Sequence, residues 1–113
     1  MFDAGQTRTV PHELQHPDLA DVDLPSLLHA LSDPVRLEIV RNLAELNECA
    51  CGAIELPVSK ATASHHFKVL REAGVISQHD VGTRRISALR TDDLEQRFPG
   101  LLDSVLRAAQ SEL

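Results

Sequence analysis

The feature that most constrains the fold is a change of hydrophobic period at Gly74. Over residues 60–73 apolar residues recur at helical spacing, and beyond Gly74 apolar and polar residues alternate as they do in a strand. Ser59 is a favourable N-cap residue, and glycine readily adopts the left-handed conformation that ends many helices. The pattern therefore predicts a helix over 60–73 with three core-facing residues, Ala63, Phe67 and Leu70.

A β-hairpin is predicted directly after this helix. Two alternating segments, 75–79 and 85–89, flank residues 80–84, which include Gly82. A short connection that contains glycine is typical of antiparallel strands joined by a tight turn.

Two helices are predicted upstream. Pro25 suits a first helical position, and leucines share one face over residues 24–31. Asp33, followed by proline, favours the start of a second helix that runs to about residue 46. The side chains expected to face outward from this second helix are Arg36, Glu38, Arg41, Asn42 and Glu45.

Further helical segments are predicted around these elements. A short helix over 51–56 would end at Pro57. A last helical region begins near Thr91, breaks at residues 98–100 and resumes at Leu101.

A short helix, a tight turn, a second helix and a hairpin, in this order, form a winged helix-turn-helix. The expected fold class is therefore mainly α with a β-hairpin wing. Small polar and basic side chains on the second helix can meet base edges and phosphates in the major groove, and the hairpin tip can reach the neighbouring backbone or minor groove. The alternative is a small helical domain whose polar helix and hairpin are merely solvated. Binding to double-stranded DNA is predicted through Ser59, Lys60, Thr62, Ser64, His65, Lys68, Thr83, Arg84 and Arg85.

The charge distribution favours DNA binding although the net charge of the chain is −6. Residues 59–90 contain six basic and two acidic residues, a local charge of +4, so the rest of the chain carries −10. A basic patch on an acidic body can still meet phosphates, while the body limits nonspecific binding.

Residues 1–22 are polar and lack a sustained period, which predicts a flexible N-terminal arm before a domain over 23–113. The first residues lack the features of a signal peptide, and no segment approaches the ~20 apolar residues of a membrane span. Two closely spaced cysteines are too few for a secreted disulfide framework. A cytoplasmic protein without a membrane partner is expected. With three aromatic residues, all phenylalanine, the chain does not suit binding to single strands by base stacking.

Two separated segments, 31–40 (LSDPVRLEIV) and 59–76 (SKATASHHFKVLREAGVI), resemble the ArsR/SmtB family of winged-helix metalloregulators. The resemblance covers about residues 24–106. It implies a homodimer whose first and last helices pack across the two-fold axis. It also implies that the dimer binds a palindromic operator and represses transcription until an inducer binds. Apolar residues at both ends of the domain are the candidates for this interface, with an ordinary core position as the alternative for each: Leu24, Leu27, Leu28, Leu101, Leu102, Val105 and Leu106.

Cys49 and Cys51 lie where many members of this family carry a cysteine pair that binds thiophilic ions. Two thiolates provide half of a tetrahedral site, for an ion of the zinc, nickel, cadmium or arsenic class. His12 and His16, four residues apart in the arm, could complete the site from either subunit. The arm has no cysteine, and Asp103 has no histidine partners in the last helix, so the family's zinc-type interface site is not expected.

The same sequence features allow other functions. The cysteines could instead sense oxidants or reactive sulfur, or take no part in sensing. The chain could also be a winged-helix module that acts through an accessory protein. An enzyme is not expected, because the neighbouring Ser64 and His65 diverge on a helix, and because the sequence has no phosphate-binding glycine loop.

Overall fold

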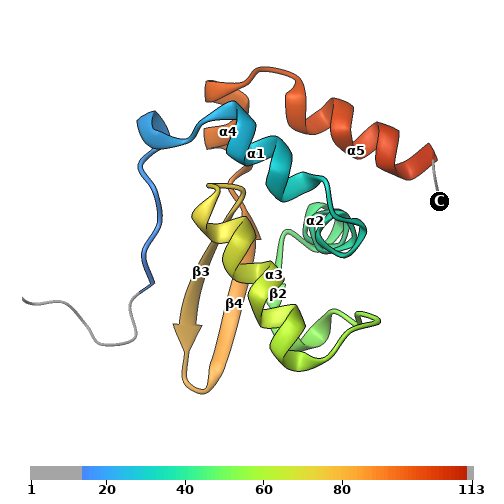
Figure 1. The fold of residues 1–113 in the computed structure, drawn as a ribbon. Helices are drawn as coiled ribbons and strands as arrows, with labels where there is room; N and C mark the ends of the chain where they lie inside the picture. Colours follow the sequence, from blue (N-terminus) through green and yellow to red (C-terminus); the bar gives the residue numbers. More distant parts are fainter. Residues whose placement is uncertain (1–13, 112–113) are drawn as a thin grey trace, which may run out of the picture.

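The computed structural model describes residues 14–111, apart from the side chain of Cys51 (Figure 1). A short 3₁₀ turn, η1 (Leu19–Asp21), precedes α1 (Leu24–Leu31) and α2 (Pro34–Leu46). Both helices begin with a proline in the first turn and an aspartate N-cap. The Asp23 carboxylate accepts from Ser26 N–H, and the Asp33 carboxylate accepts from Val35 and Arg36 N–H.

The predicted short helix over 51–56 is wrong. In its place the chain forms a three-residue strand, β2 (Glu48–Ala50), and a 3₁₀ turn, η2 (Cys51–Ala53). Asn47, with a φ of 66°, turns the chain out of α2 and into this strand. β2 pairs with the wing, and this long-range contact leaves no local hydrophobic period from which the strand could be predicted.

Helix α3 (Lys60–Glu72) confirms the predicted second helix of the helix-turn-helix. The Ser59 hydroxyl accepts from Thr62 N–H at 3.2 Å, which caps the start of the helix. At the end, Val75 N–H donates to Leu70 C=O and Gly74 N–H donates to Arg71 C=O, which is the Schellman pattern. Gly74 has a φ of 87°, as this motif requires.

The predicted hairpin is formed by β3 (Ile76–Val81) and β4 (Arg84–Leu89). The connection is shorter than expected, because Val81 pairs with Arg84 and leaves two residues, Gly82 and Thr83, in the turn. Gly82 has a φ of 62° at the first turn position, as in a type II′ turn. With β2, the hairpin makes an antiparallel sheet in the order β2-β4-β3.

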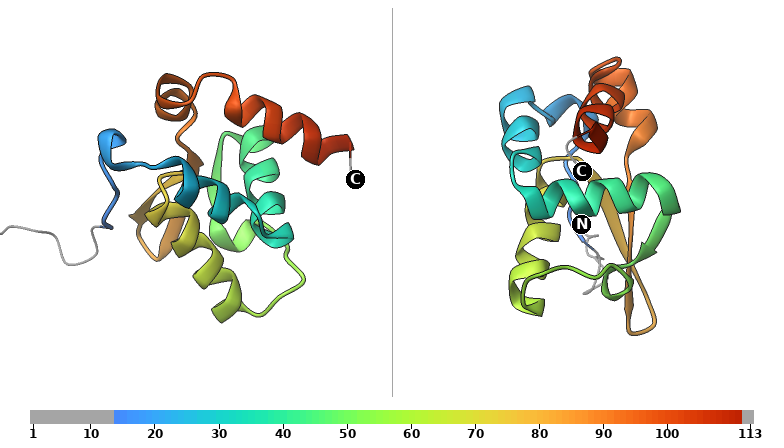
Figure 2. Two further views of the ribbon diagram at one scale, coloured as in Figure 1. Left: turned by 45° about the horizontal axis from the view of Figure 1, so that its top comes forward. Right: turned by 90° about the vertical axis from the view of Figure 1, so that its right-hand side faces the viewer.

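Two helices close the chain, α4 (Thr91–Arg97) and α5 (Leu101–Ser111), on either side of the predicted break. They lie with α1 at one end of the molecule, and the wing tip and the start of α3 lie at the other (Figures 1 and 2). The core between them is formed by buried side chains of all the main helices and of β3, chiefly Leu27, Ile39, Val40, Leu43, Phe67, Leu70, Val75, Ile76 and Leu94.

Arg36 does not face outward as predicted. Only 7% of the residue is exposed. Its guanidinium donates to the carbonyl oxygens of Ala30 and His29, and it lies 3.0 Å from Nδ1 of His66. These partners on α1 and α3 compensate for the burial of a charge that the helical period alone assigns to the surface.

Candidate nucleic-acid interface

One face of α3 is exposed and carries the polar and basic residues predicted to contact DNA. Lys60, Thr62, Ser64, His65 and Lys68 are all exposed, whereas the opposite face contributes His66, Phe67 and Leu70 to the interior. Ser59 lies at the start of this face, where its hydroxyl also donates to Thr62 Oγ1 at 3.1 Å. The helix therefore offers a row of hydrogen-bond donors and two ammonium groups along one side.

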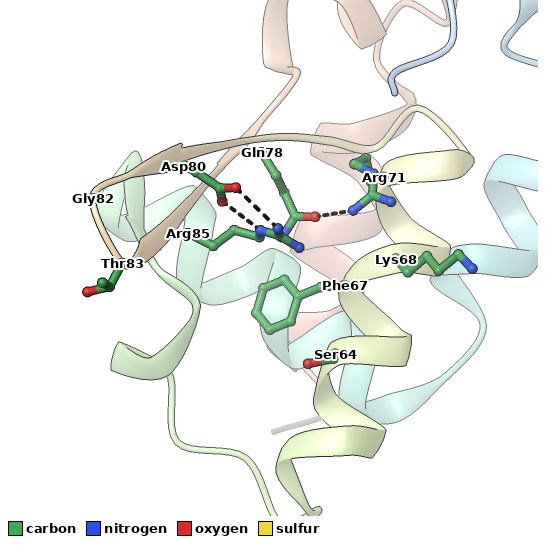
Figure 3. Close-up of a pocket in the computed structure, with 9 residues that line it drawn as sticks. All are labelled: Ser64, Phe67, Lys68, Arg71, Gln78, Asp80, Gly82, Thr83 and Arg85. Carbon is green, nitrogen blue, oxygen red and sulfur yellow. Dashed lines mark hydrogen bonds and ion pairs between the residues drawn. The ribbon is translucent and has the colours of Figure 1, made fainter. Parts of the chain in front are cut away.

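A groove of about 510 Å³ separates α3 from the wing (Figure 3). From α3 it is lined by Ser64, Phe67, Lys68 and Arg71, and from the hairpin by Gln78, Asp80, Gly82, Thr83 and Arg85. Three of these side chains are cationic and one is acidic, so the groove has a positive balance suited to a phosphate backbone.

The basic residues of the wing tip differ in their surroundings. Arg85 pairs with Asp80 through Nε at 2.8 Å and Nη2 at 3.3 Å, so part of its charge is offset within the wing (Figure 3). Thr83 and Arg84 are exposed at and beside the turn. The structure therefore brings Thr83 and Arg84 to the tip and directs Arg85 along the groove.

A buried polar network at the floor of this groove was not predicted from the sequence. Arg71 Nη1 donates to Gln78 Oε1 at 2.7 Å, and Gln78 Nε2 donates to Ser87 Oγ at 3.0 Å. Gln78 is 3% exposed and Ser87 is fully buried. The signal in the sequence is Gln78 itself, a polar residue two positions after Ile76 on the inward face of the strand. The network joins the recognition helix to both strands of the wing.

Residues 14–22, the last part of the predicted arm, lie beside β3 at His16 and continue to α4. His16 Nε2 accepts a hydrogen bond from Gln78 N–H at 2.9 Å. Pro17 C=O accepts from Arg90 and Val22 C=O accepts from Arg97, each at 2.9 Å. Partial burial and the positive charges of Arg71 and Arg90 lower the pKa of His16, against the effect of a hydrogen bond with the Leu14 backbone. The neutral imidazole is the form that can accept from Gln78.

The structure separates the two predicted metal ligands whose side chains it describes, Cys49 and His16. Cys49 lies in β2, and His16 lies beside β3, at the opposite edge of the three-stranded sheet. Two strand spacings, about 10 Å, separate these edge strands. His12 and the side chain of Cys51 lie outside the described part of the chain. Within residues 14–111 as described, no group of three or more histidine, cysteine, aspartate or glutamate residues could hold a metal ion.

The apolar residues predicted for a dimer interface fall into three groups by exposure. Leu24 and Leu28, on α1, are 41% and 45% exposed. Leu27 and Leu102 are buried in the core of the chain itself. Three further candidates, Leu101, Val105 and Leu106, are half-buried and pack on the edge of this core.

None of the helices described is both long and apolar enough to cross a membrane.

Comparison with known proteins agrees with this architecture. Residues 31–79 match a family model described as a helix-turn-helix domain. The uncharacterized HTH-type transcriptional regulator YceK of Bacillus subtilis (strain 168) is 37% identical over 82 residues, which cover 70% of this chain and 82% of the relative. An arsenical resistance operon repressor of Staphylococcus xylosus is 34% identical over 74 residues, covering 65% and 71% of the two chains.

A solved structure is similar as well. The transcriptional repressor BigR from Xylella fastidiosa superposes with a TM-score of 0.59 and 26% identity, over 74% of this chain and 83% of that one. The comparisons confirm the winged-helix fold and the resemblance found in the two sequence segments, and the proteins of this family are regulators rather than enzymes. The chain is a DNA-binding transcriptional regulator that belongs to the ArsR/SmtB family.

Proposed function

We propose that this regulator is a repressor that binds a palindromic operator as a homodimer. The observation that carries the proposal is the exposed polar and basic face of α3 beside the cationic groove of the wing. An α-helix fits the major groove of B-DNA, where the Ser64 and His65 side chains can read base edges. Lys60 and Lys68 are placed to meet phosphates, and Arg84 at the wing tip can contact the neighbouring backbone or minor groove.

The exposed leucines of α1 support the homodimer. Leu24 and Leu28 leave apolar area in water at the end of the molecule opposite the wing tip (Figure 1). Packing this face and α5 against a second copy would bury it and direct both α3 helices toward one side. Two recognition helices related by a two-fold axis then enter major grooves about 34 Å apart, which requires a palindromic site.

The DNA-binding proposal is tested by fluorescence anisotropy on an operator selected from random duplexes. Lys68→Ala should weaken binding and reduce the slope of log affinity against log salt by about one, because one phosphate contact is lost. Ser64→Ala should instead change the preferred base at one position of each half-site. The matched control is Arg41→Ala on α2, which removes a cation paired with Glu38 outside α3 and the wing and should leave both slope and preference unchanged.

Equal salt slopes for the parent, Lys68→Ala and Arg41→Ala would mean that the basic face of α3 is only a solvated surface. A parent chain that binds no duplex without an added protein would instead favour action through an accessory partner.

A response to a metal ion is a second candidate function. It is favoured by the Cys49–Ala50–Cys51 segment next to the helix-turn-helix, and by the name of the Staphylococcus xylosus relative, which links that protein to arsenical resistance. We propose that the two cysteines provide thiolate ligands, with His12 or His16 as further ligands. Because His16 lies at the opposite edge of the sheet from Cys49, a site with both requires a second chain or the departure of residues 14–17 from β3.

The metal proposal is tested by titration with Co²⁺ followed in the near ultraviolet. Thiolate coordination should give a charge-transfer band that is absent in the Cys49→Ser/Cys51→Ser double variant and weaker in His12→Ala/His16→Ala. Metal binding should release the operator, with a coupling of about 1–3 kcal/mol. If the parent and the double-serine variant release DNA equally in metal, oxidant and buffer, the cysteines are not the sensor.

A further inference from the structure

A buried side-chain contact joins the recognition helix to the two helices before it. Arg36 lies in the first turn of α2, and its guanidinium is hydrogen-bonded on both sides. Nε donates to Ala30 C=O at 2.6 Å and Nη2 lies 3.3 Å from His29 C=O, while Nη1 lies 3.0 Å from Nδ1 of His66. Arg36 is 7% exposed and His66 is 9% exposed, so water competes little for these bonds.

The partners on α1 are carbonyl groups at the end of that helix. The last carbonyl oxygens of a helix lack intrahelical partners and carry the negative end of the helix dipole, so a guanidinium is favoured there. Arg36 is therefore fixed against α1, and from this position it can serve as a rigid donor to α3.

The chemistry of the pair sets the state of the imidazole. A guanidinium donates and never accepts, so Nδ1 of His66 must be the acceptor and the ring proton must lie on Nε2. Other groups nearby are the Asp33 carboxylate at the start of α2 and the ring of His65, whose centroid lies 6.1 Å from that of His66. Burial acts to raise the pKa of Asp33, but the hydrogen bonds from Arg36 and Val35 N–H and the positive charge of Arg36 lower it overall, so this carboxylate stays ionised.

We propose that His66 is a positioning residue for operator binding: its neutral Nδ1, held by Arg36, fixes the orientation of α3 relative to α1. Since α1 carries the exposed leucines of the proposed dimer, this contact sets how the two recognition helices of a dimer are spaced. His66 itself faces the interior and contacts no base. The inference rests on the proposed homodimer on a palindromic operator.

Three substitutions distinguish positioning from simple packing. In His66→Asn the side-chain oxygen can take the place of Nδ1, so the bond from Arg36 is retained. In His66→Gln the oxygen reaches farther, toward the place of Nε2, and in His66→Leu there is no acceptor. His79→Asn is the matched control, because this exposed histidine of β3 lies outside the contact and does not line the groove.

We expect His66→Asn and His79→Asn to bind the selected operator like the parent. His66→Gln and His66→Leu should bind about ten-fold or more weakly, the change expected when a hydrogen bond to a charged group is lost. All four should remain dimeric by sedimentation. Affinity for a duplex with a single half-site should change far less, because the α3 surface itself is unaltered. If His66→Leu does not fold, the comparison of Asn with Gln decides the question.

A spectroscopic measurement tests the same point in the parent. The ¹⁵N spectrum of the histidines should show an unprotonated Nδ1 for His66, and the signal should change in Arg36→Lys. A protonated Nδ1, or equal operator affinity for the Asn, Gln and Leu variants, would overturn the inference while leaving the proposed function intact. A parent that binds no palindromic duplex would overturn both.

Discussion

At the scale of single residues, two separate features of the structure require glycine at position 74: the backbone conformation and the close packing of Val22. Its φ of 87° lies in the left-handed region, where a Cβ is disfavoured by about 1–2 kcal/mol. A Cβ built there would also lie 2.5 Å from Cγ2 of Val22, a buried residue of the N-terminal segment. The glycine that ends α3 thus also makes room for the chain that packs beside the wing.

Gly74→Ala should lower the free energy of unfolding by about 2 kcal/mol or more, since left-handed strain and a close contact add. Two matched variants separate these causes in urea unfolding. Gly100→Ala has a φ of 81° but open space around the new methyl group, so it should show the strain alone. Gly52→Ala has neither feature and should be near neutral. An equal decrease in the free energy of unfolding for Gly74→Ala and Gly100→Ala would show that Val22 moves away from the new methyl group without loss of stability.

The helix caps are predictable from the sequence, whereas the burial of certain polar side chains is not. Asp33 and Ser59 were predicted as helix caps because capping depends on groups within three residues along the chain. The burial of Arg36 and of Gln78 depends on partners 30 and 7 positions away in the chain, on other elements. A helical or strand period assigns a face to a side chain, but it does not identify such partners.

At the scale of elements, segment 14–22 contacts the outer strand of the wing through His16 and the last helices through its backbone carbonyls. The sequence showed the hairpin through its alternation, but it gave no sign that part of the polar arm would lie along β3. Segment 14–22 is bound through backbone carbonyls and one imidazole nitrogen, which leave no periodic pattern. The three-residue strand β2 escaped prediction for a related reason, since its pairing with β4 is entirely nonlocal.

The contact between His16 and β3 should weaken in acid. The pKa of His16 is lowered in the folded protein, so the folded state favours the neutral imidazole and its contribution to stability is present above the unfolded value of about 6.5. That contribution is lost as the pH falls below this value toward the lowered folded pKa. Amide exchange at Gln78 should therefore rise as the pH falls below about 6.5, beyond its intrinsic pH dependence.

Two variants control for other titrating groups. His16→Gln places an amide oxygen near the position of Nε2 and should protect the Gln78 amide at every pH, while His16→Leu should leave it poorly protected throughout. An acid-dependent change of equal size in His16→Gln would assign the effect to another group.

At the scale of the whole molecule, the surface is divided by charge and by polarity. The cationic groove lies between α3 and the wing. Helix α1, which carries the exposed leucines, lies toward the end of the molecule opposite the wing tip (Figure 2). This division allows one end to meet a polyanion while the other associates with a second copy. It also accounts for DNA recognition by a chain whose net charge is −6.

Leu28→Asp should convert the dimer to a monomer without unfolding it, because the side chain is 45% exposed in the single chain and its loss leaves the core intact. Sedimentation at micromolar concentration should give about 12.4 kDa for the variant and about twice that mass for the parent. Leu102→Asp is the contrasting variant, since Leu102 is 8% exposed and a buried carboxylate should lower the thermal midpoint as well. A parent that sediments as a monomer would contradict the proposed interface.

The hydrogen bond between His16 and the wing has a consequence for any inducer that is a metal ion. Nε2 of an imidazole has a single lone pair, and here that lone pair is already engaged by Gln78 N–H. Nε2 of His16 can therefore either coordinate a metal ion or accept the hydrogen bond from Gln78 in the wing, but not both at once. If operator binding requires the hydrogen bond between His16 and Gln78, the competition is reciprocal by thermodynamic linkage. Metal bound at Nε2 then lowers the affinity for the operator, and bound operator lowers the affinity for the metal by the same factor.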